Sequence, residues 1–241
     1  MQFVVTPHPV VTQAVASAGC DAIIVDCEHG PIDFSDAMAM VAAMKGTGST
    51  PFVRVPSISQ AAVKRSLDLG AEGIVFPLAR SAADVEEAVA TLRYPPRGTR
   101  GFGPFIASSC HDFDMVQAVA HYEANPPVCY VLVETVEAVE NIEAIAAVGG
   151  IDVLQIAQFD LSTALGISGQ FDHPMFLEAE RHVEAAVLKA GKAALGAVAL
   201  SRERAHELHA RGYRVVVGFD LWWLKQSIRE TQRWVEEGGE E

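Results

Sequence analysis

Short apolar runs alternate with longer segments of helical periodicity along the whole chain. The runs are rich in Val and Ile, and they are hydrophobic at successive positions rather than at every second one. Such runs are typical of strands in a parallel sheet that is covered on both faces. We therefore predict eight strands, at 3–6, 22–26, 52–55, 73–77, 128–134, 153–157, 193–198 and 214–219.

The intervening segments carry apolar residues at helical spacing and end in helix-stop signals. Ser81 is placed to cap a helix whose first turn holds Asp84 and Glu86, where the helix dipole favours acids. Gly70, Gly149, Gly191 and Gly212 each follow such a segment, as left-handed C-terminal caps do. The predicted helices are 12–18, 34–45, 59–69, 81–92, 114–123, 138–148, 175–190, 201–210 and 221–236.

Each predicted strand is followed by a helix, which implies right-handed crossovers and a parallel sheet. Eight such units in 241 residues predict one α/β domain over residues 1–241, a (β/α)8 TIM barrel. An open doubly wound sheet is disfavoured because no Gly-x-Gly-x-x-Gly follows the first strand. The Gly- and Pro-rich segment 93–112 is too irregular for a helix or strand, and long loops of this kind tend to be functional.

The charge balance narrows the range of partners. With 18 basic and 31 acidic residues the net charge is −13, which disfavours nucleic acid and anionic membranes as partners. No apolar run is long enough to span a bilayer, and the N-terminus does not resemble a secretory signal. The four cysteines form no Cys-x-x-Cys pair, so we interpret them as buried free thiols in a reducing cytoplasm: Cys20, Cys27, Cys110 and Cys129.

Residues of catalytic type follow several of the predicted strands. A TIM barrel carries its active site at the C-terminal ends of its strands. We therefore expect one cluster formed by the segment Asp26-Cys27-Glu28-His29 after the second strand, Arg54 after the third, Glu134 after the fifth, Asp160 after the sixth and Asp220 after the eighth.

These residues allow more than one interpretation. Glu134 and Asp160, on adjacent strands, are suited to hold Mg²⁺ or Mn²⁺, but each could instead pair with an arginine or cap a helix. Arg54 could bind a carboxylate or ketone oxygen, or form an ion pair with Glu28 or Asp26. His29 could act as a general base or be an ordinary hydrogen-bonded residue.

Two further features bear on the chemistry and the assembly. None of the five lysines lies at the C-terminal end of a predicted strand, so enolate chemistry here would need a metal rather than a Schiff base. Trp222, Trp223 and Trp234 fall in the last predicted helix. They either pack within the chain or form an apolar face against another subunit.

The motifs around these residues resemble those of the HpcH/HpaI family of metal-dependent, class II pyruvate aldolases. This family includes 4-hydroxy-2-oxoheptanedioate aldolase and 2-dehydro-3-deoxyglucarate aldolase. Order and spacing hold over nearly the whole chain. The matching pieces are Asp26-Cys-Glu-His-Gly-Pro31, Val53-Arg-Val-Pro56, Val63 to Pro77, Arg93-Tyr-Pro-Pro-Arg-Gly-Thr-Arg-Gly101, Glu134-Thr-Val-Glu-Ala138 and Asp160-Leu-Ser162.

The resemblance implies a TIM barrel that forms a homo-oligomer, a hexamer built from dimers that exchange the last helix, at about 221–236. It implies Mg²⁺, Mn²⁺ or Co²⁺ held by Glu134 and Asp160, and pyruvate oxygens bound by Arg54. It further implies that His29 helps activate a metal-bound water as base, paired with Asp68 of a neighbouring subunit. Asp26 would support the site.

The sequence departs from the family pattern in two places. Ala157-Gln158-Phe159-Asp160 stands where the family has Gly-Pro-x-Asp, whose backbone amides help hold the pyruvate carboxylate. Gln158 and Phe159 are therefore expected to reshape the substrate pocket or to supply a side-chain donor. Leu132 replaces a glutamine often found two residues before the metal-binding glutamate.

The resulting prediction is reversible cleavage of a 4-hydroxy-2-oxo acid to pyruvate, or a related 2-oxo acid, and an aldehyde. The alternatives are decarboxylation of oxaloacetate through the same enolate, a carbon–carbon lyase acting on a CoA thioester, and a barrel without catalysis. A CoA lyase would need a basic patch for the nucleotide, and none is evident in this acidic chain.

Overall fold

The computed structural model describes residues 1–103 and 114–237. Eight parallel strands pair in chain order, and β1 pairs with β8 to close the barrel, which confirms the predicted TIM barrel. The strands are β1 (Gln2–Val4), β2 (Ala22–Asp26), β3 (Thr50–Arg54), β4 (Gly73–Phe76), β5 (Val128–Val133), β6 (Val153–Ile156), β7 (Ala194–Val198) and β8 (Val215–Phe219).

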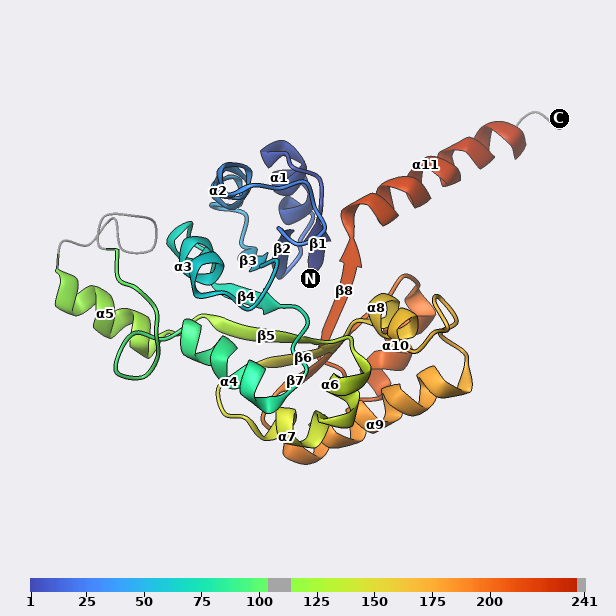
Figure 1. The fold of residues 1–241 in the computed structure, drawn as a ribbon. Helices are drawn as coiled ribbons and strands as arrows, with labels where there is room; N and C mark the ends of the chain where they lie inside the picture. The colour runs from blue at the N-terminus through green and yellow to red at the C-terminus, as the bar shows by residue number, and fades with distance from the viewer. Residues whose placement is uncertain (104–113, 238–241) are drawn as a thin grey trace.

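Helices connect the strands around the outside of the barrel (Figure 1). They are α1 (Pro9–Ser17), α2 (Phe34–Ala43), α3 (Gln60–Asp68), α4 (Ala82–Thr91), α5 (Met115–Ala124), α6 (Val136–Glu140), α7 (Ile142–Ala147), α8 (Gln158–Ala164), α9 (Pro174–Ala190), α10 (Arg202–Ala210) and α11 (Asp220–Glu237).

The strands are apolar on both faces because each face meets a separate core. Outward-facing side chains such as Val25, Val53 and Val131 belong to the layer beneath the helices. Inward-facing side chains fill the barrel, and Phe52 occupies the space left by Gly73 on the next strand, where an added Cβ would lie 2.1 Å from its ring. The inward layer comprises Phe3, Ala22, Ile24, Phe52, Val75, Tyr130, Leu132, Val153, Ala157, Val198 and Val217.

Several local predictions are confirmed. Ser81 and Asp84 form a reciprocal capping box at the start of α4, in which the Ser81 hydroxyl accepts from the Asp84 amide at 3.2 Å. Gly191 closes α9 in the left-handed conformation, with φ 63°. The prediction for Gly149 was wrong, because its neighbour Gly150 takes the positive φ, 92°.

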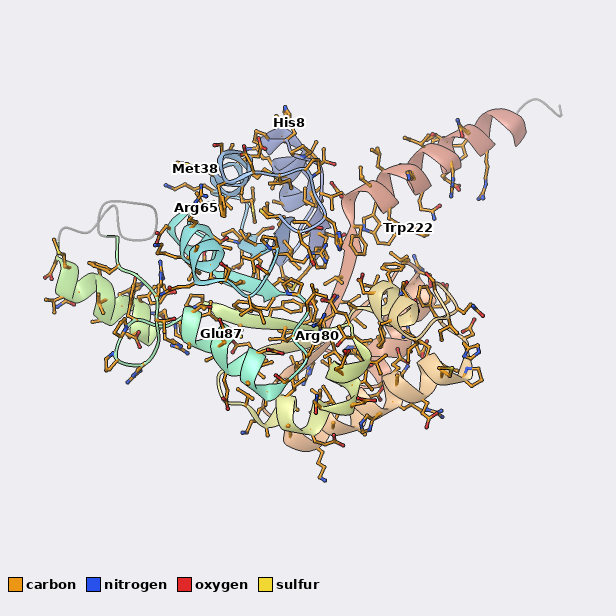
Figure 2. The ribbon with its side chains drawn as sticks, in the orientation of Figure 1. His8, Met38, Arg65, Arg80, Glu87 and Trp222 are labelled. Carbon is orange, nitrogen blue, oxygen red and sulfur yellow. The ribbon has the colours of Figure 1, made fainter. Side chains whose placement is uncertain are left out.

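The region after β5 differs from prediction. The helix expected at 138–148 is two helices, α6 and α7, separated at Asn141. The Asn141 side-chain amide donates to the carbonyl of Arg80 at 3.0 Å, which ties this break to the loop after β4, where Figure 2 labels Arg80. A further short helix, α8, follows β6, where the sequence offered a short helix only as an alternative interpretation of Asp160.

The described cysteines are free, but only one is fully buried. Cys129 lies in the core, whereas Cys20 and Cys27 are half-buried, so the prediction of buried thiols was wrong for these two. Cys20 precedes β2 and Cys27 follows it, and both pack against the outer core without being enclosed by it. Cys110 and the remainder of the irregular segment, 104–112, lie outside the described residues.

The last helix, α11, projects from the body of the barrel (Figures 1 and 2). Trp223 donates from its indole nitrogen to Gln2 at 2.7 Å, which ties the start of the helix to β1. Large apolar side chains remain exposed along it: Leu221, Trp222, Trp223, Leu224, Ile228 and Trp234. No helix within 1–103 or 114–237 is both long enough and apolar enough to cross a membrane.

Candidate active site

Strand periodicity brings the predicted site residues together at the C-terminal mouth of the barrel. Side chains alternate between the two faces of a strand, so residues two apart face the same way. Arg54 follows inward-facing Phe52 by two positions, and Glu134 follows inward-facing Leu132 by two. Asp26 ends β2, directly opposite Arg54 in the register of the barrel. The top of the interior is therefore charged, although the layers below it are apolar.

Asp26 and Arg54 form a buried two-pronged ion pair. Arg54 donates from Nε to Asp26 Oδ1 at 2.8 Å and from Nη2 to Oδ2. Asp26 Oδ1 also accepts from the amides of Glu28 and His29, which fixes the turn after β2. Asp26 thus orients both the arginine and the histidine-bearing loop.

Arg54 also pairs with Glu28, at 3.1 Å from Nη1 to Oε2. Burial alone lowers the pKa of Arg54, but the hydrogen bond and charge of Asp26, with Glu28 and Glu134, raise it overall. Both ion-pair partners considered from the sequence are therefore real. The hydrogen bonds to Asp26 occupy two of the five guanidinium N–H groups, while Glu28 pairs with Nη1 by charge alone, so Nη1 and one N–H of Nη2 remain for a substrate oxygen.

Glu134 is the most perturbed carboxyl group of the mouth. It is 3% exposed, and its Oε1 accepts a hydrogen bond from the amide of Leu78. Burial raises the pKa of Glu134 to about 7; the Leu78 amide opposes this rise, and the charges of Asp160 and Glu28 add to it. Within the described parts of the chain, no Lys, Arg or His forms an ion pair with Glu134.

Leu78 was not expected from the sequence to have a role. It is the one non-glycine residue with a positive φ, 57°, among those that the structure describes. This left-handed backbone is costly for a residue with a Cβ, and it aims the amide at Glu134. No sequence signal marks such a position, because glycine or asparagine would be the usual choice there.

Asp160 lies in the first turn of α8 and is exposed. It does not cap that helix, since the cap position falls to Ala157, which offers no side-chain hydrogen bond. Its charge raises the pKa values of both Glu134 and Glu28, which places it within electrostatic reach of both carboxylates. Beside it, Gln158 is buried and Phe159 is 40% exposed.

His29 lies on the loop after β2 with its side chain 60% exposed. The nearest acidic partner is Glu28, whose Oε2 lies 4.0 Å from Nε2. No hydrogen bond within the described chain fixes the imidazole, which is open to solvent at the mouth.

Two acidic residues do not join this cluster. Asp68 ends α3 and pairs with the buried Arg100, 3.0 Å from Oδ1 to Nη2, while the Arg100 guanidinium stacks on Tyr122 at 4.2 Å. Asp220 accepts hydrogen bonds from the amides of Val5 and Thr6 and so fastens the end of β8 to the loop after β1.

The remaining donors suit a hard divalent cation. Glu134, Asp160 and Glu28 offer only carboxylate oxygens, and among the lysines and arginines of the described chain only Arg54 pairs with this group. No set of three His, Cys, Asp or Glu residues outside the gaps at 104–113 and 238–241 is arranged as a complete metal site. A cation held by two of these carboxylates, with its other coordination positions free for a chelating substrate, would fit this arrangement.

A comparison with models of protein families shows which family the chain belongs to. The model of HpcH/HpaI aldolase/citrate lyase matches residues 1–226. The chain belongs to this family. The resemblance inferred from the motifs is thereby confirmed, and the chain is a member of an aldolase and lyase family of enzymes.

Curated relatives in this family are aldolases of 2-oxo acids. The 4-hydroxy-4-methyl-2-oxoglutarate aldolase tasA of Hapsidospora irregularis is 37% identical over 214 residues, which are 85% of this chain and 78% of the relative. The hydroxypyruvate/pyruvate aldolase of Roseovarius nubinhibens is 32% identical over 225 residues, covering 92% and 86%.

Solved structures agree with the fold. A HpcH/HpaI aldolase/citrate lyase family protein from Burkholderia cenocepacia superposes with a TM-score of 0.92 at 30% identity, covering 98% of this chain and 93% of that one. The citrate lyase beta subunit from M. tuberculosis, complexed with oxaloacetate and magnesium, shares the fold at 20% identity and a TM-score of 0.58, covering 90% and 89%.

Proposed function

We propose that this enzyme is a divalent-metal-dependent pyruvate aldolase that reversibly cleaves a 4-hydroxy-2-oxo acid to pyruvate, or a related 2-oxo acid, and an aldehyde. The observation that carries the proposal is the buried Glu134 carboxylate, which has acidic neighbours and no ion-pair partner in the described chain. The names of the curated relatives support the same reaction class.

Glu134 and Asp160 would hold Mg²⁺, Mn²⁺ or Co²⁺. When bound, the cation would polarise the carboxylate and ketone oxygens of the 2-oxo acid and stabilise the negative charge of the enolate. Arg54 would contribute the N–H groups that Asp26 does not use to the same oxygens, and Asp26 would hold it in place. Gln158, at the start of α8, would contact the substrate carboxylate.

His29 would act as the base. In the cleavage direction His29 removes the proton of the C4 hydroxyl, and the C3–C4 bond breaks. The electron pair of that bond forms the enolate, while C4 leaves as the aldehyde. Protonation at C3 then gives the methyl group of the 2-oxo acid. Oxaloacetate decarboxylation would yield the same enolate, so both substrates belong in the assay.

Exchange of the pyruvate methyl protons in D₂O tests enolate formation without any aldehyde. We expect Mg²⁺-dependent exchange in the wild type, at least a hundredfold less in Glu134→Gln and Asp160→Asn, and no change in Glu87→Gln, an exposed carboxyl on α4 (Figure 2). Full exchange in Glu134→Gln would contradict the assignment of the metal ligands.

We further propose that Asp68 of a neighbouring subunit pairs with His29. The support is that, among the residues that the structure describes, no hydrogen bond holds the His29 imidazole, and Asp68 uses Oδ1 for Arg100 and leaves Oδ2 without a hydrogen bond. The variants His29→Ala and Asp68→Asn should each be inactive alone but regain activity when mixed and reassembled. Failure of the mixture to recover, with both variants assembled, would exclude a shared site.

The exposed apolar side chains of α11 support assembly. We propose a hexamer, built as a trimer of dimers that exchange α11, because the exposed Trp and Ile side chains of this projecting helix would be buried against another copy. Light scattering should give a hexamer for the wild type and for Gln226→Glu, and smaller species for Ile228→Glu. A monomeric wild type would contradict the proposal.

A further inference from the structure

A continuous row of aromatic rings borders one side of the charged centre. Phe3 and Phe219 stack with ring centroids 5.2 Å apart, and Phe219 lies 6.0 Å from Phe159. Phe159 in turn meets Phe171 edge to face at 5.6 Å. We call Phe3, Phe219, Phe159 and Phe171 the aromatic wall; it joins β1, β8, α8 and the loop after α8.

The aromatic wall begins at the substrate-binding arginine. The Arg54 guanidinium carbon lies 4.8 Å from the centre of the Phe3 ring. Further along the wall, Phe159 directly precedes the proposed metal ligand Asp160. Phe3 is fully buried, Phe219 and Phe171 are half-buried, and Phe159 is 40% exposed. The wall therefore runs from the core to the surface, and Phe159 is its most exposed ring.

The side chains of the wall favour some aldehydes over others. The wall itself carries no positive charge to attract an aldehyde with a carboxylate, and Arg54, beside Phe3, is already paired with Asp26 and Glu28. The ring atoms of the wall offer no hydrogen-bond partner to a polyhydroxylated chain. An apolar or aryl group, by contrast, would cover Phe159 and could pack edge to face against it.

We propose that the aromatic wall selects the aldehyde, and that this enzyme prefers aldehydes with an aryl or other apolar substituent over anionic or polyhydroxylated ones. The inference rests on the proposed function. In the synthetic direction C3 of the enolate forms a bond to the aldehyde carbon, whose carbonyl electron pair moves to oxygen and takes up a proton. The substituent on that carbon lies against Phe159 and Phe219.

The test compares kcat/KM for addition of pyruvate to benzaldehyde, glyceraldehyde and glyoxylate. We expect benzaldehyde to be the best acceptor of the wild type, and the ratio of benzaldehyde to glyceraldehyde to fall about tenfold in Phe159→Ala, the loss of one aromatic contact. Phe159→Leu should lose less. Phe102→Ala, at a ring of similar exposure, 39%, on the segment before α5, should keep the wild-type ratio.

The outcomes separate the inference from the function on which it rests. A wild type that exchanges pyruvate protons but prefers glyoxylate overturns the inference alone, whereas a wild type without exchange overturns the proposed function. Equal losses for all three aldehydes in Phe159→Ala and Phe159→Leu would show that the ring only anchors the loop after α8. A change of oligomeric state in both variants would show that it serves an interface, which also overturns the inference.

Discussion

Replacing Glu134 by glutamine should make the metal-free protein more stable at alkaline pH. Burial raises the pKa of Glu134 to about 7 from its usual 4.5. Between these values the folded chain holds a proton that the unfolded chain has released, so the free energy of unfolding falls as pH rises from about 4.5 to 7 and stays lower above it. The difference corresponds to about 3 kcal/mol at pH 8.

Glutamine keeps the shape of the side chain and an acceptor for the Leu78 amide, but it carries no charge. In EDTA at pH 8, Glu134→Gln should therefore exceed the wild type by up to about 3 kcal/mol, or roughly 6–12 °C in Tm. At pH 5, where the wild-type carboxyl is mostly neutral, the advantage should shrink to less than about 1 kcal/mol.

Differential scanning fluorimetry at the two pH values measures this, with Glu87→Gln as the matched control. Adding Mn²⁺ should raise the Tm of the wild type and leave that of Glu134→Gln unchanged. Two results would refute the reasoning that Glu134 is a buried charge that binds a cation. One is a Glu134→Gln variant with a lower Tm than the wild type at pH 8, and the other is an Mn²⁺-induced rise in Tm as large in the variant as in the wild type.

Three further predictions concern the supports of the site and the barrel. Arg54→Met should destabilise the protein by about 3–5 kcal/mol in urea unfolding, because it leaves Asp26 buried without its partner, and adding Asp26→Asn should recover much of the loss. Asp220→Ala should lower the free energy of unfolding by about 1–3 kcal/mol, because the amides of Val5 and Thr6 lose their acceptor. Its Mn²⁺ affinity in calorimetry should equal that of the wild type, and a weaker affinity would show that Asp220 belongs to the metal site. Ser81→Ala should lower the free energy of unfolding by about 1 kcal/mol in the same urea assay and leave the exchange of pyruvate methyl protons unchanged. A larger loss of stability would show that Ser81 has a role beyond capping α4.

The fold could be predicted because one pattern, an apolar run followed by a helical segment, repeats along the chain. Eight apolar runs, each followed by a helix, leave few topologies, and the period of two along β3 and β5 places Arg54 and Glu134 at the mouth of the barrel. Helix ends were less predictable. Asn141 divides the predicted helix because its side chain finds the Arg80 carbonyl, a contact between residues far apart in sequence.

The gathering of carboxylates and an arginine at the mouth could be predicted, but the contacts that support them could not. The strand ends indicated Asp26, Arg54 and Glu134, which lie together, and also Asp220, which binds backbone amides instead. Leu78 could not be found, because its role depends on a backbone conformation that its residue type disfavours. The aromatic wall also escaped prediction, since Phe3, Phe159 and Phe219 are brought together only by closure of the barrel.

Anomalous diffraction from crystals grown with Mn²⁺ and pyruvate tests the central claim most directly. The account predicts one strong peak bound by the carboxylates of Glu134 and Asp160, with pyruvate oxygens completing its coordination and Arg54 beside them. A peak elsewhere, or none at saturating Mn²⁺ with both carboxylates turned away from each other, would contradict it.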